Sequence, residues 1–214
     1  MSTASSPRCT ACWPDAAVAK RLFDLIASAL GLVLLSPLLL GVALWIRLDS
    51  PGPVFFRQER VGRGGRPFRI HKFRTMAHGA PGLQLTVGAD ARITRAGQLL
   101  RRTRLDELPQ LLDVLRGEMS LVGPRPEVPR YVALYPAGLR ERALAVRPGI
   151  TDPASLAFID EAERLARAAD PEREYVEVIL PLKVRAAAEY AEHATLWTDL
   201  QVLARTLRTL LRHG

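Results

Sequence analysis

Residues 101–126 read RRTRLDELPQLLDVLRGEMSLVGPRP, and the interpretation of the whole chain depends on this stretch. Arginines precede an adjacent acid pair, Asp106 and Glu107, and a Gly-Pro-Arg-Pro segment ends the stretch. Proline is tolerated in the first turn of a helix, where backbone N–H groups lack partners in any case. Pro109 therefore predicts a helix that begins near Asp106 and ends at Gly117, a favourable stop residue. Its expected apolar stripe consists of Leu108, Leu111, Leu112 and Leu115.

The acid pair has two interpretations. Acidic residues in a first helical turn are usually ordinary caps. The same position favours an ionised carboxylate and attracts phosphate, because the helix N-terminus carries partial positive charge, and such a carboxylate can act as a nucleophile. The surroundings favour the second interpretation. Arginine makes forked contacts to phosphate, and Pro124 and Pro126 restrict the backbone on both sides of Arg125.

Composition narrows the class of protein. The chain has 214 residues, so a single domain is the default, and its net charge of +8 indicates anionic partners such as nucleic acid, anionic lipid or a phosphorylated substrate. Only 6% of residues are aromatic, which does not favour a base-stacking surface. Cys9 and Cys12 are the two cysteines; no second pair or nearby histidine completes a zinc site, and a disulfide scaffold is excluded.

Residues 22–46, LFDLIASALGLVLLSPLLLGVALWI, form an apolar segment whose one charge is Asp24. As a straight helix it would be about 37 Å long, enough to cross a hydrocarbon core of about 30 Å. Two features complicate a simple span. Ser36-Pro37 predicts a kink, and basic residues on both flanks would hold both ends in the cytoplasm. On these features alone, a span and a re-entrant helix both remain open.

The other expected elements follow in order. Residues 54–76 predict a strongly basic β-hairpin around the turn at 62–65, which contacts either anionic lipid headgroups or a diphosphate. A helix is expected from about residue 90, with Gly97 allowing close packing. Short or charged helices are expected at 127–135, 139–146, 161–169 and from 170. Residues 196–211 predict an amphipathic helix that packs on the core or lies on a membrane.

Three strings together resemble the bacterial sugar transferase family, the monotopic polyprenol-phosphate phosphoglycosyl transferases. They are LDELPQLLDVLRGEMSLVGPRP, the segment PGPVFFRQERVG with KFRTM after it, and RPGIT at 147–151. The resemblance implies an α/β fold, mostly helical with a small β-hairpin. It implies an N-terminal re-entrant membrane helix broken at Ser36 and Pro37, with amphipathic interfacial helices around a compact catalytic core. We expect a disordered tail at 1–15, the membrane helix at 16–48, the core at 49–195 and an amphipathic helix at 196–214.

The resemblance also implies an activity. A UDP-sugar would donate its sugar-1-phosphate to polyprenyl (undecaprenyl) phosphate through a covalent intermediate on Asp106, with UMP released, at the start of surface polysaccharide or glycoconjugate synthesis. Glu107 would act as base or metal ligand, and Asp106 and Glu107 would bind the required Mg²⁺. Residues expected to hold the phosphates are Lys72, Arg101 and Arg125, and those of the supporting motifs are Pro124, Pro126, Arg147, Pro148 and Gly149.

The implied location is the cytosolic face of the bacterial inner membrane, and nucleic acid is not an expected partner. Many relatives continue with Gly-Trp after RPGIT, whereas this chain has Asp152-Pro153-Ala154-Ser155, a departure that bears on which sugar is accepted. The sugar and the oligomeric state stay open. An alternative is a non-catalytic, membrane-anchored basic module that binds anionic lipid or nucleic acid. It explains the charge but not the motifs.

Overall fold

The protein is described here from a computed structural model that places residues 14–80, 85–88, 90–158 and 160–213. Cys9, Cys12 and nearly all of the expected tail lie outside the described residues. The elements in chain order are α1 (Pro14–Asp49), β1 (Phe55–Val61), η1 (Arg63–Gly65), β2 (Pro67–Phe73), α2 (Arg95–Thr103), η2 (Leu105–Gln110), α3 (Leu111–Arg116), β3 (Ser120–Val122), α4 (Pro129–Val132), α5 (Ala137–Ala143), β4 (Gly149–Thr151), α6 (Pro153–Ala157), α7 (Glu161–Arg167), α8 (Pro171–Glu174), the π-helical η3 (Tyr175–Ile179), α9 (Leu180–His193) and α10 (Leu196–His213).

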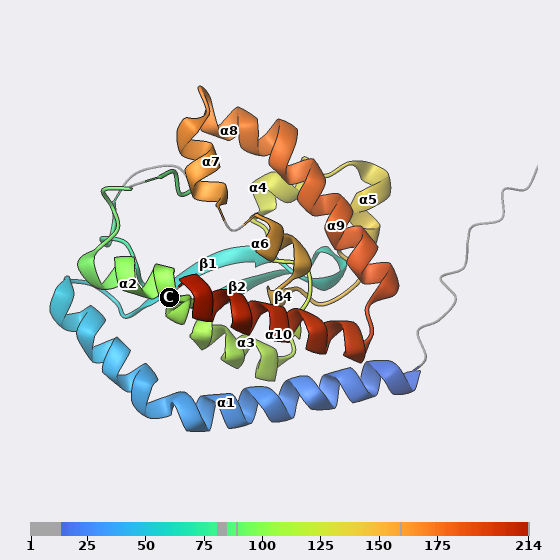
Figure 1. The fold of residues 1–214 in the computed structure, drawn as a ribbon, viewed down its shortest axis with the longest axis horizontal. Coiled ribbons are helices and arrows are strands. Elements are labelled where there is room, and N and C mark those ends of the chain that lie inside the picture. Colours follow the sequence, from blue (N-terminus) through green and yellow to red (C-terminus); the bar gives the residue numbers. More distant parts are fainter. Residues whose placement is uncertain (1–13, 81–84, 89, 159, 214) are drawn as a thin grey trace, which may run out of the picture.

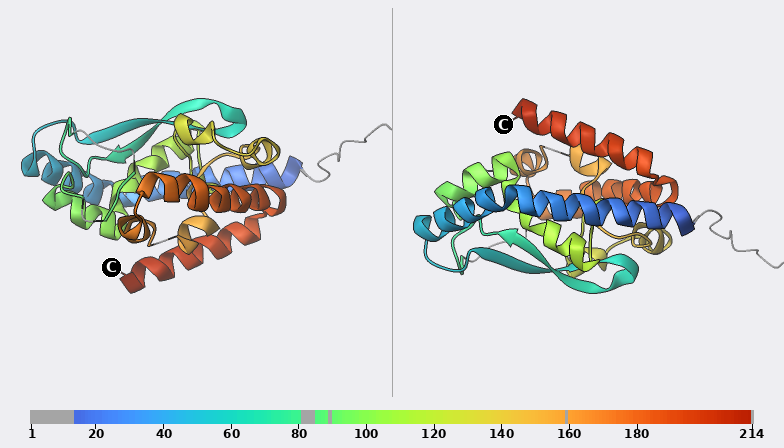
Figure 2. Two further views of the ribbon diagram at one scale, coloured as in Figure 1. Left: turned by 90° about the horizontal axis from the view of Figure 1, so that it is seen from above. Right: turned by 90° about the horizontal axis from the view of Figure 1, so that it is seen from below.

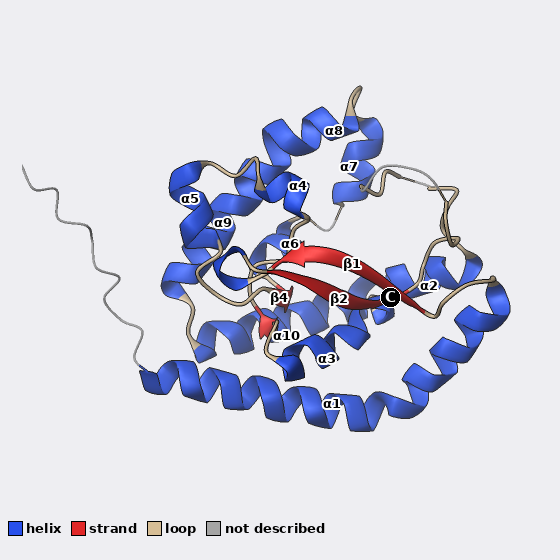
Figure 3. Ribbon diagram, turned by 180° about the vertical axis from the view of Figure 1, so that it is seen from behind, coloured by secondary structure: helices blue, strands red, loops and turns tan. Residues whose placement is uncertain are grey.

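Helices dominate the fold, and the predicted hairpin is present at its centre (Figure 3). Strands β1 and β2 are antiparallel, with Phe56 opposite Lys72 and Arg60 opposite Phe68. The predicted class, mostly helical with a small hairpin, is therefore confirmed. A second sheet was not predicted: β3 and β4 pair in parallel, and each has only three residues. Strands this short show no alternation of apolar and polar residues that a sequence pattern could detect.

Helix α1 runs along one edge of the molecule as a bent ribbon (Figure 1). The chain stays helical through Pro37, and the Ser36 hydroxyl donates a hydrogen bond to the Val33 carbonyl at 2.7 Å. A proline inside a helix removes one backbone hydrogen bond and bends the axis without ending it when the neighbouring turns hold. The helix therefore continues through Ser36 and Pro37, where an interruption was expected. The path of α1 through lipid stays a prediction.

The N-terminal part of α1 is attached to the core by buried polar contacts. Asp24, the one charge in its apolar segment, is 2% exposed and accepts hydrogen bonds from the Ser120 hydroxyl at 2.8 Å and the Leu121 backbone N–H at 3.2 Å. Lys20 forms an ion pair with Asp199 of α10. A buried carboxylate is costly unless its oxygens are satisfied, so these contacts define where this part of α1 docks.

The C-terminal part of α1 is attached by apolar packing, because Val42 and Ile46 are buried in one cluster with Phe73 and Leu100. Between and beside these attachments much of the helix has no protein cover. Its exposed apolar side chains are Val18, Leu22, Ile26, Leu30, Val33, Leu34, Leu38, Leu40, Leu44, Trp45 and Leu48. Among the described residues, this is the one helix long and apolar enough to cross a membrane. The molecule therefore presents a large apolar surface along one helix.

The helix predicted at 106–117 forms in two parts. It begins as the 3₁₀ helix η2 and continues as α3, which ends at Gly117 in the left-handed conformation, φ 87°, as predicted. Arg104, φ 57°, separates η2 from α2. Pro109 has no N–H to donate, which is consistent with a tight first part before regular α-helix begins at Leu111. The acid pair therefore lies in the 3₁₀ turn.

Helix α2 packs against the end of the hairpin through Gly97, as predicted. A Cβ atom added at Gly97 would lie 2.0 Å from the carbonyl oxygen of Thr75, so only glycine permits this approach. Thr94 caps the helix by accepting a hydrogen bond from the Gly97 N–H. Ala96 and Leu100 are fully buried, whereas Leu99 is 46% exposed.

The C-terminal half covers the other side of the hairpin with helices that share one apolar core. That core contains Val128, Tyr131, Leu165, Tyr175, Ile179, Leu180 and Val184. Helix α10 confirms the expected amphipathic helix but docks through Asp199 and Val202, while Trp197, Leu200 and Leu207 are exposed. Seen from below, α10 and the hairpin flank α1 on opposite sides (Figure 2).

Candidate active site

Asp106 and Glu107 lie at the floor of a cavity of about 600 Å³ between the hairpin, α2, η2 and the α6–α9 region. Lys and Arg outnumber acids in its lining; the charged lining residues are Arg60, Lys72, Arg74, Arg92, Arg101, Arg104, Arg125 and Lys183 against Asp106, Glu107, Glu127 and Glu161. Such an excess of cations attracts phosphate groups. The structure thus brings together five predicted site residues, Asp106, Glu107, Lys72, Arg101 and Arg125.

The two oxygens of Asp106 have different surroundings. The side chain is 2% exposed, and its Oδ2 lies 2.7 Å from Nζ of Lys72. Its Oδ1 is buried and has no hydrogen-bond partner among the described residues. A buried carboxylate oxygen without a donor is costly, and such groups commonly mark places where a ligand completes the structure. Asp106 therefore offers one free oxygen to whatever occupies the cavity.

Glu107 is held by cations instead. Arg125 donates to both of its oxygens, through Nη1 at 3.1 Å and through Nη2, and Nζ of Lys72 lies 3.4 Å away. Burial alone would raise the pKa of Glu107, but the charges of Arg125 and Lys72 outweigh it and hold the pKa well below its ordinary value of 4.5. Glu107 raises the pKa of the Arg125 guanidinium in turn. This acid stays ionised and orients two cations toward the cavity.

Arg101 reaches the cavity from α2, but its hydrogen bonds go to two threonines. Its Nε donates to Oγ1 of Thr75 and its Nη1 to Oγ1 of Thr86, both at 2.9 Å. Burial lowers the pKa of Arg101, and the nearby charge of Asp106 acts in the opposite direction. The threonines hold the guanidinium in place without neutralising it, so its charge remains available to an anion.

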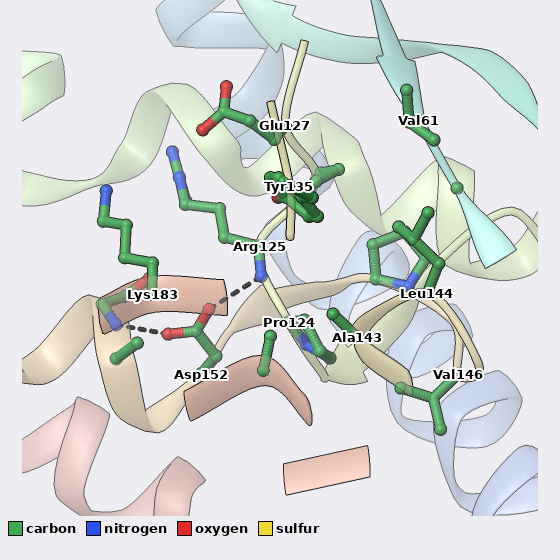
Figure 4. A pocket seen from close by; sticks show the side chains of 16 residues that line it. Val61, Pro124, Arg125, Glu127, Tyr135, Ala143, Leu144, Val146, Asp152 and Lys183 are labelled. Carbon is green, nitrogen blue, oxygen red and sulfur yellow. Dashed lines mark hydrogen bonds between the residues drawn. The ribbon is translucent and has the colours of Figure 1, made fainter. Parts of the chain in front are cut away.

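The segments GPRP and RPGIT meet, and their contact positions Arg125. Gly123 and Gly149 approach so closely that a Cβ on Gly149 would lie 2.1 Å from the Gly123 nitrogen. The backbone N–H of Arg125 donates to Oδ2 of Asp152 at 2.7 Å (Figure 4). Asp152 also caps α6. It belongs to the DPAS segment that departs from the family pattern, and its contact with Arg125 could not be read from the sequence.

Other predicted motif residues lie outside the cavity. Arg147 donates through Nε to the Gly117 carbonyl at 2.8 Å, so it joins β4 to the end of α3. Pro148 and Gly149 do not line the large cavity, and Ser36 and Pro37 lie on α1 away from it. Of the two prolines beside Arg125, Pro126 lines the cavity and Pro124 does not. The RPGIT segment thus contacts the GPRP segment outside the cavity, where the Gly149 N–H donates a hydrogen bond to the Pro124 carbonyl.

The end of the cavity that is lined by Arg60, Glu127 and Lys183 was not predicted from the sequence. Glu127 pairs with Arg60 at 3.3 Å and accepts a hydrogen bond from the Tyr175 hydroxyl. Lys183 from α9 pairs with Glu161 and lies 6.0 Å from the Phe158 ring. Figure 4 draws a second, smaller pocket that shares Arg125, Glu127 and Lys183 with this cavity, and in it these three side chains point in the same direction. Strand alternation could have placed Arg60 on the face of Lys72, but nothing local marks Lys183.

The sequence model of the family described as "Bacterial sugar transferase" matches residues 15–213. A UDP-glucose:undecaprenyl-phosphate glucose-1-phosphate transferase of Caulobacter vibrioides is 42% identical over 196 residues, which cover 90% of this chain and 69% of that protein. A UDP-N-acetylgalactosamine-undecaprenyl-phosphate N-acetylgalactosaminephosphotransferase of Aeromonas hydrophila is 38% identical over 92% of this chain, and the chain spans 45% of its length. With a match from α1 to α10, the chain belongs to the bacterial sugar transferase family.

Proposed function

We propose that this protein is a phosphoglycosyl transferase that moves a sugar-1-phosphate from a UDP-sugar to undecaprenyl phosphate, with release of UMP. The observation that carries the proposal is the buried Asp106, whose Oδ1 has no partner, on the floor of a cavity with an excess of cations. The relatives support the reaction class, since several are named as undecaprenyl-phosphate sugar phosphotransferases. They give no support to a non-catalytic basic module.

Asp106 is the proposed nucleophile. Its Oδ1 attacks the phosphorus that carries the sugar, the bond between that phosphorus and the bridging oxygen breaks, and the bridging oxygen leaves with UMP. An oxygen of undecaprenyl phosphate then attacks the same phosphorus, and Asp106 leaves as a carboxylate. The cations Lys72, Arg101 and Arg125 are arranged before the reaction to hold phosphate oxygens, which lowers the barrier without reorganisation.

For Glu107 we propose a positioning role rather than that of a general base. A lowered pKa makes a carboxylate a weak base, and both of its oxygens already accept hydrogen bonds from Arg125. The acceptor does not require a strong base either, since a phosphate monoester has a second pKa of about 6 and is largely ionised at neutral pH. Glu107 then keeps Lys72 and Arg125 in place through both steps.

The residues present fit a Mg²⁺ ion only together with the substrate. Among the described residues no group of three or more His, Cys, Asp or Glu side chains could hold a metal. Mg²⁺ is commonly bound through one or two carboxylates plus substrate phosphates, and Asp106, which in the described part of the chain forms its ion pair with Lys72 alone, is the carboxylate of the pair that is open to an ion. Asp106 would hold the ion with the diphosphate, and the ion would spread the negative charge of that group. Glu107 would first have to release Arg125, so we propose Asp106 as the protein ligand.

The proposed location is the cytosolic surface of a bacterial inner membrane, with α1 inserted from one side. Both the Asp24 contact and the Val42–Ile46 packing attach α1 to the same globular core. A helix whose two parts both touch one cytosolic core can return to the face from which it entered, and its exposed apolar side chains then face lipid. In this proposed arrangement the cavity would lie near the phosphate of the acceptor.

The test is release of UMP from a panel of UDP-sugars with undecaprenyl phosphate as acceptor. We expect UMP with at least one sugar, and a covalent adduct with the mass of a phosphosugar on Asp106 when the acceptor is omitted. Asp106→Asn keeps the size of the side chain and should reduce turnover by about a thousandfold or more. Chelation with EDTA should stop turnover, and Mg²⁺ should restore it. Release of UDP would indicate an ordinary glycosyl transferase, and no nucleotide release would reject the proposal.

A further inference from the structure

The cavity face of the hairpin changes character along its length. Directly opposite residues of an antiparallel pair project from the same face of the sheet, so the pairs Phe56–Lys72, Gln58–Ile70 and Arg60–Phe68 report successive steps along it. Two residues along a strand span roughly 6.6 Å, which separates Phe56 from Arg60 by about 13 Å. At the far end, Arg60 pairs with Glu127. At the near end stands Phe56, directly across from the lysine that holds Asp106.

Phe56 is an unusual residue for this place. It is 46% exposed, although it lines a cavity that is otherwise rich in cations. Its neighbour Phe55 is almost equally exposed, at 43%, but projects from the other face, stacks on Phe73 with ring centroids 5.5 Å apart, and does not line the cavity. The packing of Phe55 explains its presence. Phe56, by contrast, lies across from Lys72 and belongs to none of the apolar clusters among the described residues.

Next to the near end of the cavity, the hairpin packs against α1. Val54, immediately before this strand, packs in the cluster of Val42 and Ile46 of α1. Leu44 and Leu48, from the same part of α1, are 61% and 77% exposed. Phe56 therefore lies two residues along the chain from the contact between Val54 and α1. A nucleotide, by contrast, is better matched by the charged far end with Arg60 and Lys183.

We propose that Phe56 binds the isoprenoid chain of the polyprenyl phosphate acceptor where the chain leaves the lipid, so that its phosphate reaches Lys72 and Asp106. The inference rests on the proposed function and deepens it by assigning the two ends of the cavity. The acceptor enters at Phe56, and the nucleotide sugar occupies the end at Arg60 and Lys183. A phenyl ring suits an isoprenoid because burial of apolar surface is favourable and needs no hydrogen bond.

The experiment compares Phe56→Ser with the matched control Phe55→Ser in the purified full chain in detergent or nanodiscs. Affinity for polyprenyl phosphate is measured directly, by native mass spectrometry or a diazirine-bearing polyprenyl phosphate, without the need for turnover. We expect about tenfold weaker binding for Phe56→Ser and at most about twofold for Phe55→Ser, with Phe56→Leu close to wild type. Photolabelling of the wild type should fall on Phe56 and not on Phe55 or Arg60.

Kinetics separate this inference from the proposed function. In Phe56→Ser the kcat/KM for polyprenyl phosphate should fall about tenfold, while the kcat/KM for the UDP-sugar stays within about twofold. A fall for the UDP-sugar alone would place the nucleotide at Phe56 and overturn the inference, as would unchanged acceptor affinity. If the wild type binds the acceptor through Phe56 but releases no UMP, the proposed reaction fails and the binding site stands. Thermal unfolding of each variant shows whether it is folded. If Phe56→Ser is unfolded, Phe56→Leu is compared with wild type instead.

Discussion

At the scale of the residue, two adjacent acids differ because their partners differ. Asp106 meets one cation and keeps one oxygen free, whereas Glu107 is surrounded by Arg125, Lys72 and the more distant Arg104. The first arrangement leaves a reactive group, and the second stabilises a fixed charge. Adjacent side chains in a 3₁₀ turn point in different directions, so one turn can supply both environments.

The lowered pKa of Glu107 predicts how stability depends on pH. A carboxyl group whose pKa is lower in the folded than in the unfolded state contributes stability that is fully present above its ordinary pKa of 4.5 and is lost as the pH falls toward the folded value. The free energy of unfolding of Glu107→Gln should therefore lie further below that of wild type at pH 7 than at pH 3. Urea titrations at the two pH values measure this.

Glu163→Gln is the matched control, since Glu163 forms an exposed pair with Arg167 on α7. That variant should change the free energy of unfolding by no more than about 0.5 kcal/mol at either pH. An equal loss for Glu107→Gln at pH 7 and pH 3 would contradict the linkage argument.

At the scale of the element, the hairpin contacts the helices that form the site and positions them relative to one another. Its β2 strand presents Lys72 to the acid pair, and its continuation at Arg74 and Thr75 contacts α1 and α2. On the opposite face, His71 is joined to Asp113 of α3 by a 2.5 Å contact and by a backbone hydrogen bond at 2.8 Å. Helices α1, α2 and α3 therefore all contact β2 or the residues that follow it, and the geometry of the site depends on these contacts.

The close approach of α2 to the hairpin predicts a large effect from one methyl group. Gly97→Ala would place a Cβ 2.0 Å from the Thr75 carbonyl oxygen, where backbone cannot yield easily, and should destabilise the protein by about 2–3 kcal/mol. Gly138→Ala on α5 is the control, because a Cβ there meets nothing within 4 Å. It should be neutral or stabilising by up to about 1 kcal/mol. Chemical denaturation of both variants provides the comparison, and similar values would show that α2 can move.

Arg74 predicts a second effect, on the end of α1. Its guanidinium donates to the carbonyls of Ile46, Ser50, Pro51 and Pro53, which end the helix and form the following turn. Lysine cannot reproduce this set of directed bonds, so Arg74→Lys should destabilise the protein by about 2 kcal/mol and make residues 50–53 more sensitive to protease. Arg57→Lys, at an exposed position of the same hairpin, should stay within about 0.5 kcal/mol of wild type. Equal protease sensitivity of the two variants would argue against this role.

At the scale of the whole molecule, α1 lies along the core for its full length (Figure 1), and the apolar side chains that it leaves exposed form one long surface. A helix that crossed the membrane completely would separate its two ends by the thickness of the bilayer. Contacts of both its parts with one core oppose that separation. Phe73, which packs with Val42 and Ile46 of this helix, also lines the cavity.

This arrangement predicts the same side of the membrane for both ends of α1. In a background without Cys9 and Cys12, single cysteines at Asp15 and Arg57 should both react with an impermeant maleimide from the cytosolic side only. A cysteine at Leu34, whose side chain is 75% exposed in the protein, should be shielded by lipid and react only in detergent. Labelling of positions 15 and 57 from opposite sides would mean a complete span.

The sequence by itself determined the elements that depend on local chemistry. The hairpin follows from strand-forming residues around a glycine-rich turn, the end of α3 from Gly117, the close packing of α2 from Gly97, and the apolar helix from its composition. The motifs around Asp106, Arg125 and Lys72 identified the family and its reaction class, because they are long and specific. These features need no knowledge of distant contacts.

Only the tertiary structure decided which groups meet. Residues far apart in the chain meet where Asp24 contacts Ser120, where Arg125 contacts Asp152, and where Lys183 lines the same cavity as the acid pair. The register of the hairpin decided that Phe56, and not Phe55, faces that cavity. Periodicity shows that two faces exist but not which one meets a neighbouring helix, and a shift of one residue would exchange them. The roles of the two phenylalanines, and of the two acids, therefore follow from packing and not from their place in the sequence.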